Sequence, residues 1–170
     1  MSFLELAKSR YSCRKLSATA VEPEKIQRIL QAAIAAPTAK NLQRYTIWQV
    51  ASPEAFDKLK QTTNYTFGAT LAFVIGAKKD GAFDRPFDNK NFADIDAAIV
   101  ATHLMLAVQD EGLATTWVGY FDAPKLKQLF PEMQDYELIA IFPIGYPAEG
   151  AKPSNRHEDR RPLNEVVIKL

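Results

Sequence analysis

One segment constrains the fold of this chain more than any other, because it reads as a helix that is apolar on nearly every side. It runs from Asp94 to Glu111, and its apolar residues are Ile95, Ala98, Ile99, Val100, Ala101, Leu104, Met105, Ala107 and Val108. A helix that is hydrophobic all round has to be buried all round. We expect the 170 residues to form a single domain, 1–170. In so small a domain, part of this helix is expected to be buried against a second subunit.

Composition excludes several classes of protein. Lys and Arg total 21 against 20 Asp and Glu, and a net charge of +1 gives no reason to expect nucleic acid or a membrane as a partner. The single cysteine, Cys13, rules out an internal disulfide and suits a reducing cytoplasm. No His, Cys or carboxylate residues have metal-ligand spacing, so no metal is predicted. Because Met1 to Lys8 is not a signal peptide, we expect a cytoplasmic protein.

Helical and extended patterns alternate along the chain, but not in clean βαβ repeats. This predicts an α+β fold with a mixed, mostly antiparallel sheet flanked by helices. Ser2, Pro23, Ser52 and Asp122 mark the starts of four helices, since Ser and Asp are good caps and Pro suits the first helical turn. The expected strands are 46–50, 71–75, 115–119 and 138–144, of which 71–75 is apolar throughout and therefore buried on both faces.

Two further segments are more ambiguous. Residues 80–93 are polar, contain a proline and carry Phe83, Phe87 and Phe92, so we interpret them as a loop that acts as a lid. The last residues, 166–170, have a strand-like pattern at the chain terminus. A strand there would be able to pair with the sheet of another subunit.

Basic residues gather in two short stretches near the ends of the chain. The first is Arg10-Tyr11-Ser12-Cys13-Arg14, and the second is 156–162, which adds Arg156, Arg160 and Arg161. A guanidinium is a rigid fork of donors that matches phosphate oxygens two at a time. In an extended segment, alternate residues share a face, so Arg10, Ser12 and Arg14 can converge on one dianion. The pattern indicates a phosphate clamp, although scattered surface arginines are also expected at this composition.

Four segments together, in order and in register, resemble the nitroreductase family of flavin-dependent oxidoreductases, which work as intertwined homodimers. They are residues 10–16 (RYSCRKL), 35–43 (AAPTAKNLQ), 112–119 (GLATTWVG), and 144–147 (IGYP) followed by 160–163 (RRPL). The resemblance covers essentially the whole chain. It implies an FMN cofactor at the subunit interface and NADH or NADPH as the co-substrate.

The resemblance also implies a role for each matched residue. The phosphate of FMN is expected at Arg10, Tyr11 and Ser12, with Arg14 beside it and Arg160 or Arg161 completing the site. The turn Pro37-Thr38-Ala39, with Asn41 close by, is expected to lie against the flavin of the other subunit. Trp117 and Val118 lead to Gly119, whose backbone N–H is expected to face the flavin N5 edge. Many members of the family present an Asn to the pyrimidine ring where this chain has Gly68.

The implied chemistry is ping-pong hydride transfer from NAD(P)H through flavin N5 to a small-molecule acceptor such as a nitroaromatic or a quinone. Negative charge that develops on the flavin has to be stabilised, and Gly119 N–H and the cation of Arg14 are the expected catalytic groups. Two other functions compete with this one. The first is a flavin-binding sensor or carrier with little turnover, and the second is a flavin-free interaction domain that binds a partner through Phe83, Phe87 and Phe92.

The matched residues also have ordinary structural explanations. Pro37 follows a helix and is often no more than a helix stop. Trp117 in a strand is most often a core residue, and Gly119 can mark a bulge or a turn. Cys13 has no His partner nearby in the sequence and suits a small buried position better than that of a nucleophile.

Overall fold

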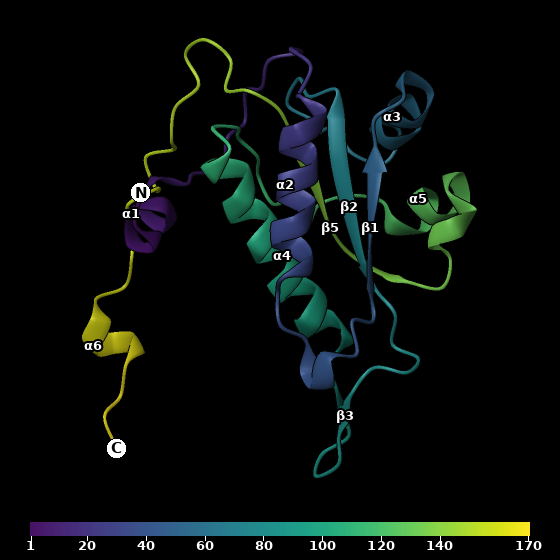
Figure 1. Ribbon diagram of the computed structural model, residues 1–170, viewed down its shortest axis with the longest axis vertical. Coiled ribbons are helices and arrows are strands. Elements are labelled where there is room, and N and C mark those ends of the chain that lie inside the picture. Colours follow the sequence, from purple (N-terminus) through teal and green to yellow (C-terminus); the bar gives the residue numbers. More distant parts are fainter.

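The computed structural model describes all residues, 1–170, and contains a small sheet between two layers of helices (Figure 1). The sheet has three strands in the order β1 (Tyr45–Val50), β2 (Leu71–Ala77) and β5 (Glu137–Ile144). Both pairings are antiparallel. The expected α+β class is confirmed, and this sheet is wholly antiparallel rather than mixed.

The central strand is buried on both faces because each face of the sheet is covered by two helices. Helices α2 (Pro23–Ile34) and α4 (Ala93–Asp110) cover one face, and α3 (Pro53–Lys60) and α5 (Ala123–Leu129) cover the other (Figure 1). All seven residues of β2 are buried. This explains why the strand is apolar throughout instead of alternating.

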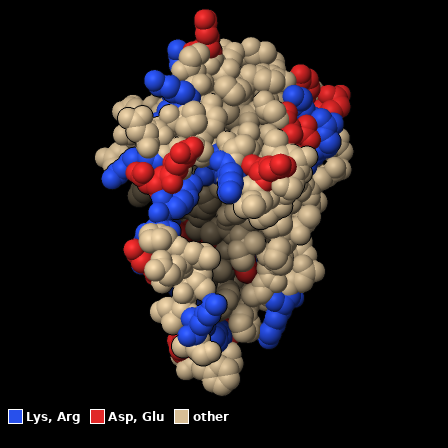
Figure 2. All heavy atoms as spheres, turned by 90° about the vertical axis from the view of Figure 1, so that its left-hand side faces the viewer, with Lys and Arg blue, Asp and Glu red and all other residues tan.

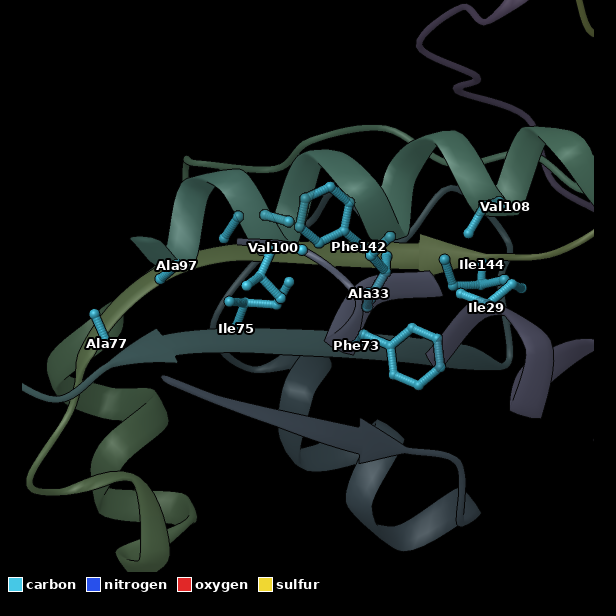
Figure 3. Close-up of a cluster of buried hydrophobic side chains, with 14 of the residues drawn as sticks. Ile29, Ala33, Phe73, Ile75, Ala77, Ala97, Val100, Val108, Phe142 and Ile144 are labelled. Atoms are coloured by element: carbon cyan, nitrogen blue, oxygen red, sulfur yellow. The ribbon is translucent and has the colours of Figure 1, made fainter. Parts of the chain in front are cut away.

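The larger core lies between the sheet, α2 and α4. Figure 3 shows Phe73 and Ile75 of β2 and Phe142 and Ile144 of β5 meeting Val100 of α4 from one side. The helices contribute small side chains here, which lets them pack close to the sheet: Ala33 from α2 and Ala97 and Ala101 from α4. The second core lies on the other face, where Val74 and Ile141 pack with Phe56, Leu59 and Leu126 of α3 and α5.

The helix starts agree with the capping residues. Ser2 forms a capping box with Glu5 at the start of α1 (Phe3–Ser9), which ends just before Arg10. Ser52 and Asp122 accept hydrogen bonds from the backbone N–H groups of Ala55 and Lys125, three residues into their helices. The residue at which each of these helices starts is therefore fixed by local sequence.

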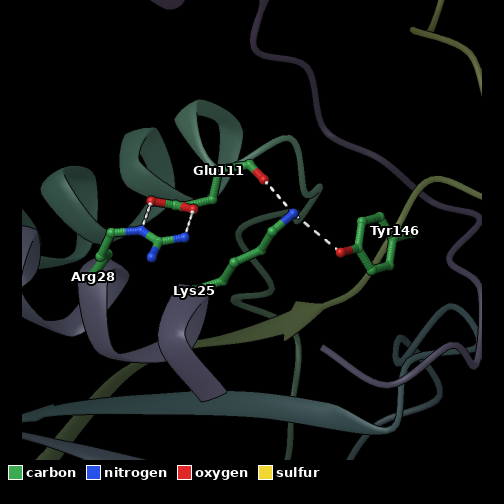
Figure 4. Close-up of polar contacts among 4 residues, drawn as sticks. All are labelled: Lys25, Arg28, Glu111 and Tyr146. Atoms are coloured by element: carbon green, nitrogen blue, oxygen red, sulfur yellow. Dashed lines mark hydrogen bonds and ion pairs between the residues drawn. The ribbon is translucent and has the colours of Figure 1, made fainter. Parts of the chain in front are cut away.

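A polar latch joins the first turns of α2 to the end of α4 (Figure 4). Arg28 donates two hydrogen bonds of 2.7 Å to the carboxylate of Glu111. Lys25 Nζ donates to the Glu111 carbonyl oxygen and to Tyr146 Oη, both at 3.0 Å. The latch holds the point where the chain leaves α4 and starts toward residues 112–119.

Helix α4 covers the predicted segment, but only one side of it is buried within the chain. The buried residues are Ala93, Asp96, Ala97, Val100, Ala101, Leu104 and Val108. On the other side, Ile95 is 37% exposed, and Ile99 and Leu106 are half-buried. One chain therefore leaves an apolar stripe of α4 uncovered.

Three predicted elements differ in the structure. Residues 115–119 are not a regular strand, because they pair only through isolated bridges, Thr115 with Ser12 and Val118 with Ile141, and no single neighbour runs beside them. Residues 80–93 are not a plain loop, since they contain a hairpin of β3 (Asp84–Arg85) and β4 (Lys90–Asn91).

The third difference lies at the C-terminus. The run 166–170 is not a strand: Val166 ends the short helix α6 (Leu163–Val166), and the residues after it are exposed. No strand of the same chain lies beside them to complete a ladder. Figure 1 shows this segment leaving the body of the molecule on the same side as the N-terminus. None of the helices is both long and apolar enough to cross a membrane.

Candidate functional site

The two basic stretches from opposite ends of the chain meet at one small polar cavity. Its volume is about 190 Å³, and its lining residues are Arg10, Tyr11, Ser12, Arg14, Ser154, Arg156, His157 and Arg160. Figure 2 looks at the side of the molecule where both termini lie and shows basic side chains, with some acidic ones among them, beside a hollow in this face. The structure thus brings together four guanidiniums and the hydroxyl groups of two serines and a tyrosine.

Backbone pairing holds the first stretch in place. After α1 ends, the backbone becomes extended at Arg10. The N–H of Cys13 then donates to the Thr115 carbonyl oxygen at 3.0 Å. Cys13 itself is fully buried in the second core, as expected for a small apolar side chain. Burial of Cys13 forces its neighbours Ser12 and Arg14 toward the opposite side, because side chains alternate along an extended segment.

The second stretch is tied to the first by its histidine. His157 donates from Nε2 to the Lys8 carbonyl oxygen at 3.1 Å, and its ring packs edge-on against Tyr11 with centroids 6.3 Å apart. Arg160 Nη1 donates to the carbonyl oxygens of His157 and Asp159, both at 2.7 Å. These contacts hold Arg160 beside Arg10.

The cavity concentrates positive charge that no carboxylate neutralises. The ion pairs of the protein involve other residues, and none of the four arginines that line the cavity takes part in one. Burial, and then the positive charge of Arg160, lower the pKa of Arg10 from its ordinary value. An anion bound here would offset both effects, so the cavity is suited to a phosphate group.

Of the two arginines proposed to complete this site, only Arg160 lines the cavity. Arg161 instead pairs with Glu165, Nε to Oε2 at 3.2 Å, and donates from Nη2 to the Glu165 carbonyl oxygen. The pairing follows from the four-residue spacing across the start of α6. Ser154 is a lining residue that the sequence motifs did not indicate, since a lone serine in a polar segment carries no signal.

Gly119 opens onto a second, larger cavity. This cavity has a volume of about 420 Å³, and the aromatic residues Tyr65, Tyr120 and Phe121 are part of its lining. Apart from its chain neighbours, no atom lies within 4 Å of the place where a Cβ of Gly119 would stand, and the residue is exposed. Tyr65 and Tyr120 meet edge to face with centroids 5.9 Å apart, and Tyr120 is 80% exposed. The cavity is therefore wide open to solvent.

The two residues before Gly119 fix its position. Val118 is buried and exchanges two backbone hydrogen bonds of 3.0 Å with Ile141 of β5. Trp117 packs edge-on against Phe142, yet 37% of it is exposed, so it is not a fully buried core residue. The segment runs extended from Thr115, next to Ser12, to Gly119. It thereby leads from the neighbour of Ser12, which lines the basic cavity, to Gly119, which lines the larger one.

Gly68 cannot be replaced by a residue with a side chain without strain. Its φ is +91°, and a Cβ there would lie 2.7 Å from the Leu16 carbonyl oxygen. The N–H of Leu16 donates to the carbonyl oxygen of the preceding Phe67 at 2.8 Å, which holds the two segments together. An Asn at this position would meet the same close approach.

Pro37, Thr38, Ala39 and Asn41 lie elsewhere, in the turn that includes η1 (Ala39–Asn41). This turn is beside the start of α4, where Ala39 N–H donates to Asp96 Oδ1 at 3.0 Å. Thr115, which pairs with Ser12, follows the other end of α4. A helix of 18 residues is about 27 Å long. Within one chain the turn and the basic cavity therefore belong to different surfaces.

No three His, Cys, Asp or Glu side chains come together in a way that could hold a metal ion.

Comparison with known proteins identifies the family of the chain. A model of the nitroreductase family matches residues 7–66 and 61–146. A relative from Methanothermobacter thermautotrophicus, named for NADH dehydrogenase or NAD(P)H nitroreductase activity, is 26% identical over 156 residues, which cover 88% of this chain and 79% of that protein.

Solved structures of the same fold cover almost the whole chain. A nitroreductase family protein from Clostridium difficile superposes with a TM-score of 0.91 and 38% identity, covering 99% of this chain and 98% of its own. A protein from Exiguobacterium sibiricum, solved in complex with FMN, has a TM-score of 0.84 at 18% identity and covers 100% of this chain and 98% of its own. On the match of the family model and the 38% identical structure, the chain belongs to the nitroreductase family.

Proposed function

We propose that this protein is an FMN-dependent oxidoreductase that takes reducing equivalents from NADH or NADPH and passes them to a small-molecule acceptor such as a nitroaromatic or a quinone. The observation that carries the proposal is the basic cavity formed by both ends of the chain. Its four arginines lack carboxylate partners, and its small volume suits a phosphate group. Family membership and the name of the Methanothermobacter thermautotrophicus relative support the same assignment.

In this proposal, Arg10, Ser12 and Arg160 bind the terminal phosphate of FMN, and Arg14, Arg156 and His157 complete the cavity around it. The fit rests on chemistry that the cavity already has: converging donors, a desolvated guanidinium at Arg10 and hydroxyl groups at Ser12 and Ser154. The isoalloxazine ring would then follow the extended segment 115–119 toward Gly119. Trp117 and Val118 serve to hold that segment against β5.

When bound, FMN supplies the hydride chemistry, and the protein supplies orientation and electrostatics. Gly119 is exposed and its N–H donates no hydrogen bond within the chain, so this donor would cost little reorganisation, since Val118 is held on β5 beside it. The charge of Arg14 offsets negative charge that develops nearby. The cavity at Gly119 is open to solvent, so water supplies the protons that the reaction consumes.

We propose further that the active form is a homodimer with the flavin at the subunit interface. The basic cavity and the turn with Pro37 and Ala39 lie toward opposite ends of α4, so a second copy would be needed to bring both sets to one flavin. The uncovered apolar stripe of α4 and the exposed side chains of Leu163 and Ile168 give such a copy apolar surface to bury.

The proposal is tested with the purified protein in two steps. FMN titration, followed by quenching of FMN fluorescence, should give saturable binding with one flavin per chain. Anaerobic stopped-flow mixing with NADH and with NADPH should then bleach the flavin absorbance, and an added quinone or nitroaromatic should restore it. Saturable binding without rapid bleaching would identify a flavin carrier or sensor instead. Absence of FMN binding would reject both functions.

A further inference from the structure

Asp96 carries a carboxylate that is buried among apolar side chains, which is an unusual environment for a residue with only a structural role. It is 2% exposed and lies on the face of α4 that also carries Ala93, Ala97 and Val100, all buried against the sheet. Its Oδ1 accepts the hydrogen bond from Ala39 N–H at 3.0 Å, and its Oδ2 is buried without a hydrogen-bond partner. An apolar residue of similar size would satisfy the packing at this position without burying a polar group.

Its position near the start of α4 reduces the cost of that burial. Asp96 is the fourth residue after Phe92, which caps the start of α4. Its carboxylate therefore lies close to the positive end of the helix dipole. Asp94 lies in the same turn and is exposed. Asp94 benefits from the same helix end, yet it forms no hydrogen bond or ion pair with the neighbouring turn. Only Asp96 is placed to act on residues 38–43.

The turn that Asp96 contacts has an unusual backbone. Lys40, Asn41 and Gln43 have φ values of 51°, 55° and 52°, in the left-handed region that residues other than glycine rarely adopt. Backbone strain of this kind persists only where the surroundings fix it, and it gathers at functional sites. Inside the turn, Gln43 N–H donates to Thr38 Oγ1 at 3.1 Å, so the loop is closed on itself. The hydrogen bond from outside is the one from Ala39 N–H to Asp96, and Lys40 Nζ also lies over the ring of Phe83, 4.8 Å from its centroid.

We infer that Asp96 is a positioning residue, which fixes the 38–43 turn in the strained conformation that presents Thr38, Ala39 and Asn41 to the flavin of a second copy. The inference rests on the proposed function, because the turn itself is assigned to the flavin only there. The carboxylate acts through the backbone of Ala39. It touches neither cavity of its own chain.

The test compares Asp96→Leu, which keeps the branching at Cγ but is larger and cannot accept a hydrogen bond, with Asp96→Asn, which has the same shape and keeps an acceptor at the same place. Asp94→Ala is the matched control, since it removes a carboxylate from the same end of α4 without touching the turn. The first measurement needs no cofactor: amide hydrogen exchange of residues 38–43, read by NMR or mass spectrometry. We expect exchange of the Ala39 amide to rise by about tenfold or more in Asp96→Leu and to stay near the wild-type rate in the other two variants.

The second measurement determines the affinity for FMN and the absorption spectrum of the bound flavin. The dissociation constant of FMN should rise about tenfold in Asp96→Leu, and the absorption bands of bound flavin should shift, with recovery in Asp96→Asn. A purely structural role would lower the melting temperature of Asp96→Leu without moving the flavin spectrum or kcat. If Asp96→Leu fails to fold, Asp96→Ala takes its place, because it removes the same acceptor without adding bulk.

The outcomes separate the two proposals. Wild-type protein that binds and reduces FMN, together with an Asp96→Leu variant of unchanged exchange, affinity and spectrum, would overturn the role of Asp96 and leave the function standing. Wild-type protein that does not bind FMN would overturn the function, and the role of Asp96 with it. Faster exchange at Ala39 with weaker FMN binding in Asp96→Leu, rescued by Asp96→Asn, would support both.

Discussion

Arg160 lies close enough to Arg10 for its positive charge to lower the pKa of the Arg10 guanidinium, although the two residues come from opposite ends of the chain. Burial contributes the larger part of that shift. Two cations held together in a partly desolvated cavity repel each other, and nothing in the chain neutralises them. Their arrangement therefore costs stability in the absence of an anion and contributes affinity when one binds.

Replacing Arg10 and Arg160 together by Ala is expected to weaken FMN binding by roughly two to four orders of magnitude. The estimate follows because a hydrogen bond from a charged group contributes about 1.5–3 kcal/mol, and each arginine supplies at least one. The measurement is the dissociation constant from quenching of FMN fluorescence. Arg161→Ala is the control, since Arg161 pairs with Glu165 outside the cavity. Equal loss of affinity in Arg161→Ala and Arg160→Ala would contradict the assignment of the cavity.

Gly68→Ala is expected to destabilise the protein more than Gly112→Ala does. Both glycines have positive φ, +91° and +71°, so both substitutions carry the backbone cost of about 1 kcal/mol or more. Only at Gly68 does the new Cβ also meet a backbone atom, the Leu16 carbonyl oxygen at 2.7 Å, while nothing lies within 4 Å at Gly112. Urea unfolding measures the difference. Similar losses at the two positions would show that the contact with Leu16 relaxes freely.

Much of the fold follows from local sequence, because caps and apolar patterns act over a few residues. Ser2, Ser52 and Asp122 each cap the helix that they were expected to start. The pattern of residues 115–119 indicates extended backbone correctly, but it does not reveal the pairing partners. Thr115 and Val118 bridge to different segments, and that depends on how the whole chain is arranged.

The same distinction holds for the site. The arginines near both ends of the chain predicted a shared cavity, because several guanidinium and hydroxyl groups can bind the same anion. Adjacent residues such as Arg160 and Arg161 point in different directions, so which of them lines the cavity depends on the backbone that follows. Asp96 was overlooked as part of an apolar helix. Its four-residue spacing from Val100 could have placed its carboxylate on the buried face.

The latch at the end of α4 should make stability depend on pH in the acid range. Hydrogen bonds from Arg28 lower the pKa of Glu111 below its ordinary value of 4.5. The stabilisation is therefore fully present above the ordinary pKa, and it is lost as the pH falls through the lowered pKa of the folded state. The partners are partly exposed, so the pair contributes at most about 1 kcal/mol.

Comparison of wild type with Glu111→Gln by urea unfolding at several pH values tests this point. The difference in unfolding free energy should be constant from pH 7 to about 5 and should shrink below pH 4.5, the ordinary value for Glu. Glu132→Gln serves as a control, because Glu132 is exposed and forms no ion pair. A difference that persists unchanged at the lowest pH would mean that packing of Glu111, rather than its charge, stabilises the latch.

Thr102→Glu is expected to dissociate the proposed homodimer. Thr102 is exposed on α4, on the side away from the buried residues and between Ile99 and Leu106, so a charge there lies in the middle of the uncovered apolar stripe. Burying that charge between two subunits would cost several kcal/mol, while the fold of one chain has room for it in solvent. Sedimentation or light scattering measures the mass, and Gln128→Glu on α5, at the other face of the sheet, should leave it unchanged.

Because the proposed flavin site needs both copies, Thr102→Glu should also lose FMN in parallel with the loss of dimer. A Thr102→Glu protein that stays dimeric would place the interface elsewhere, and a monomer that retains FMN with wild-type affinity would show that one chain suffices for the site.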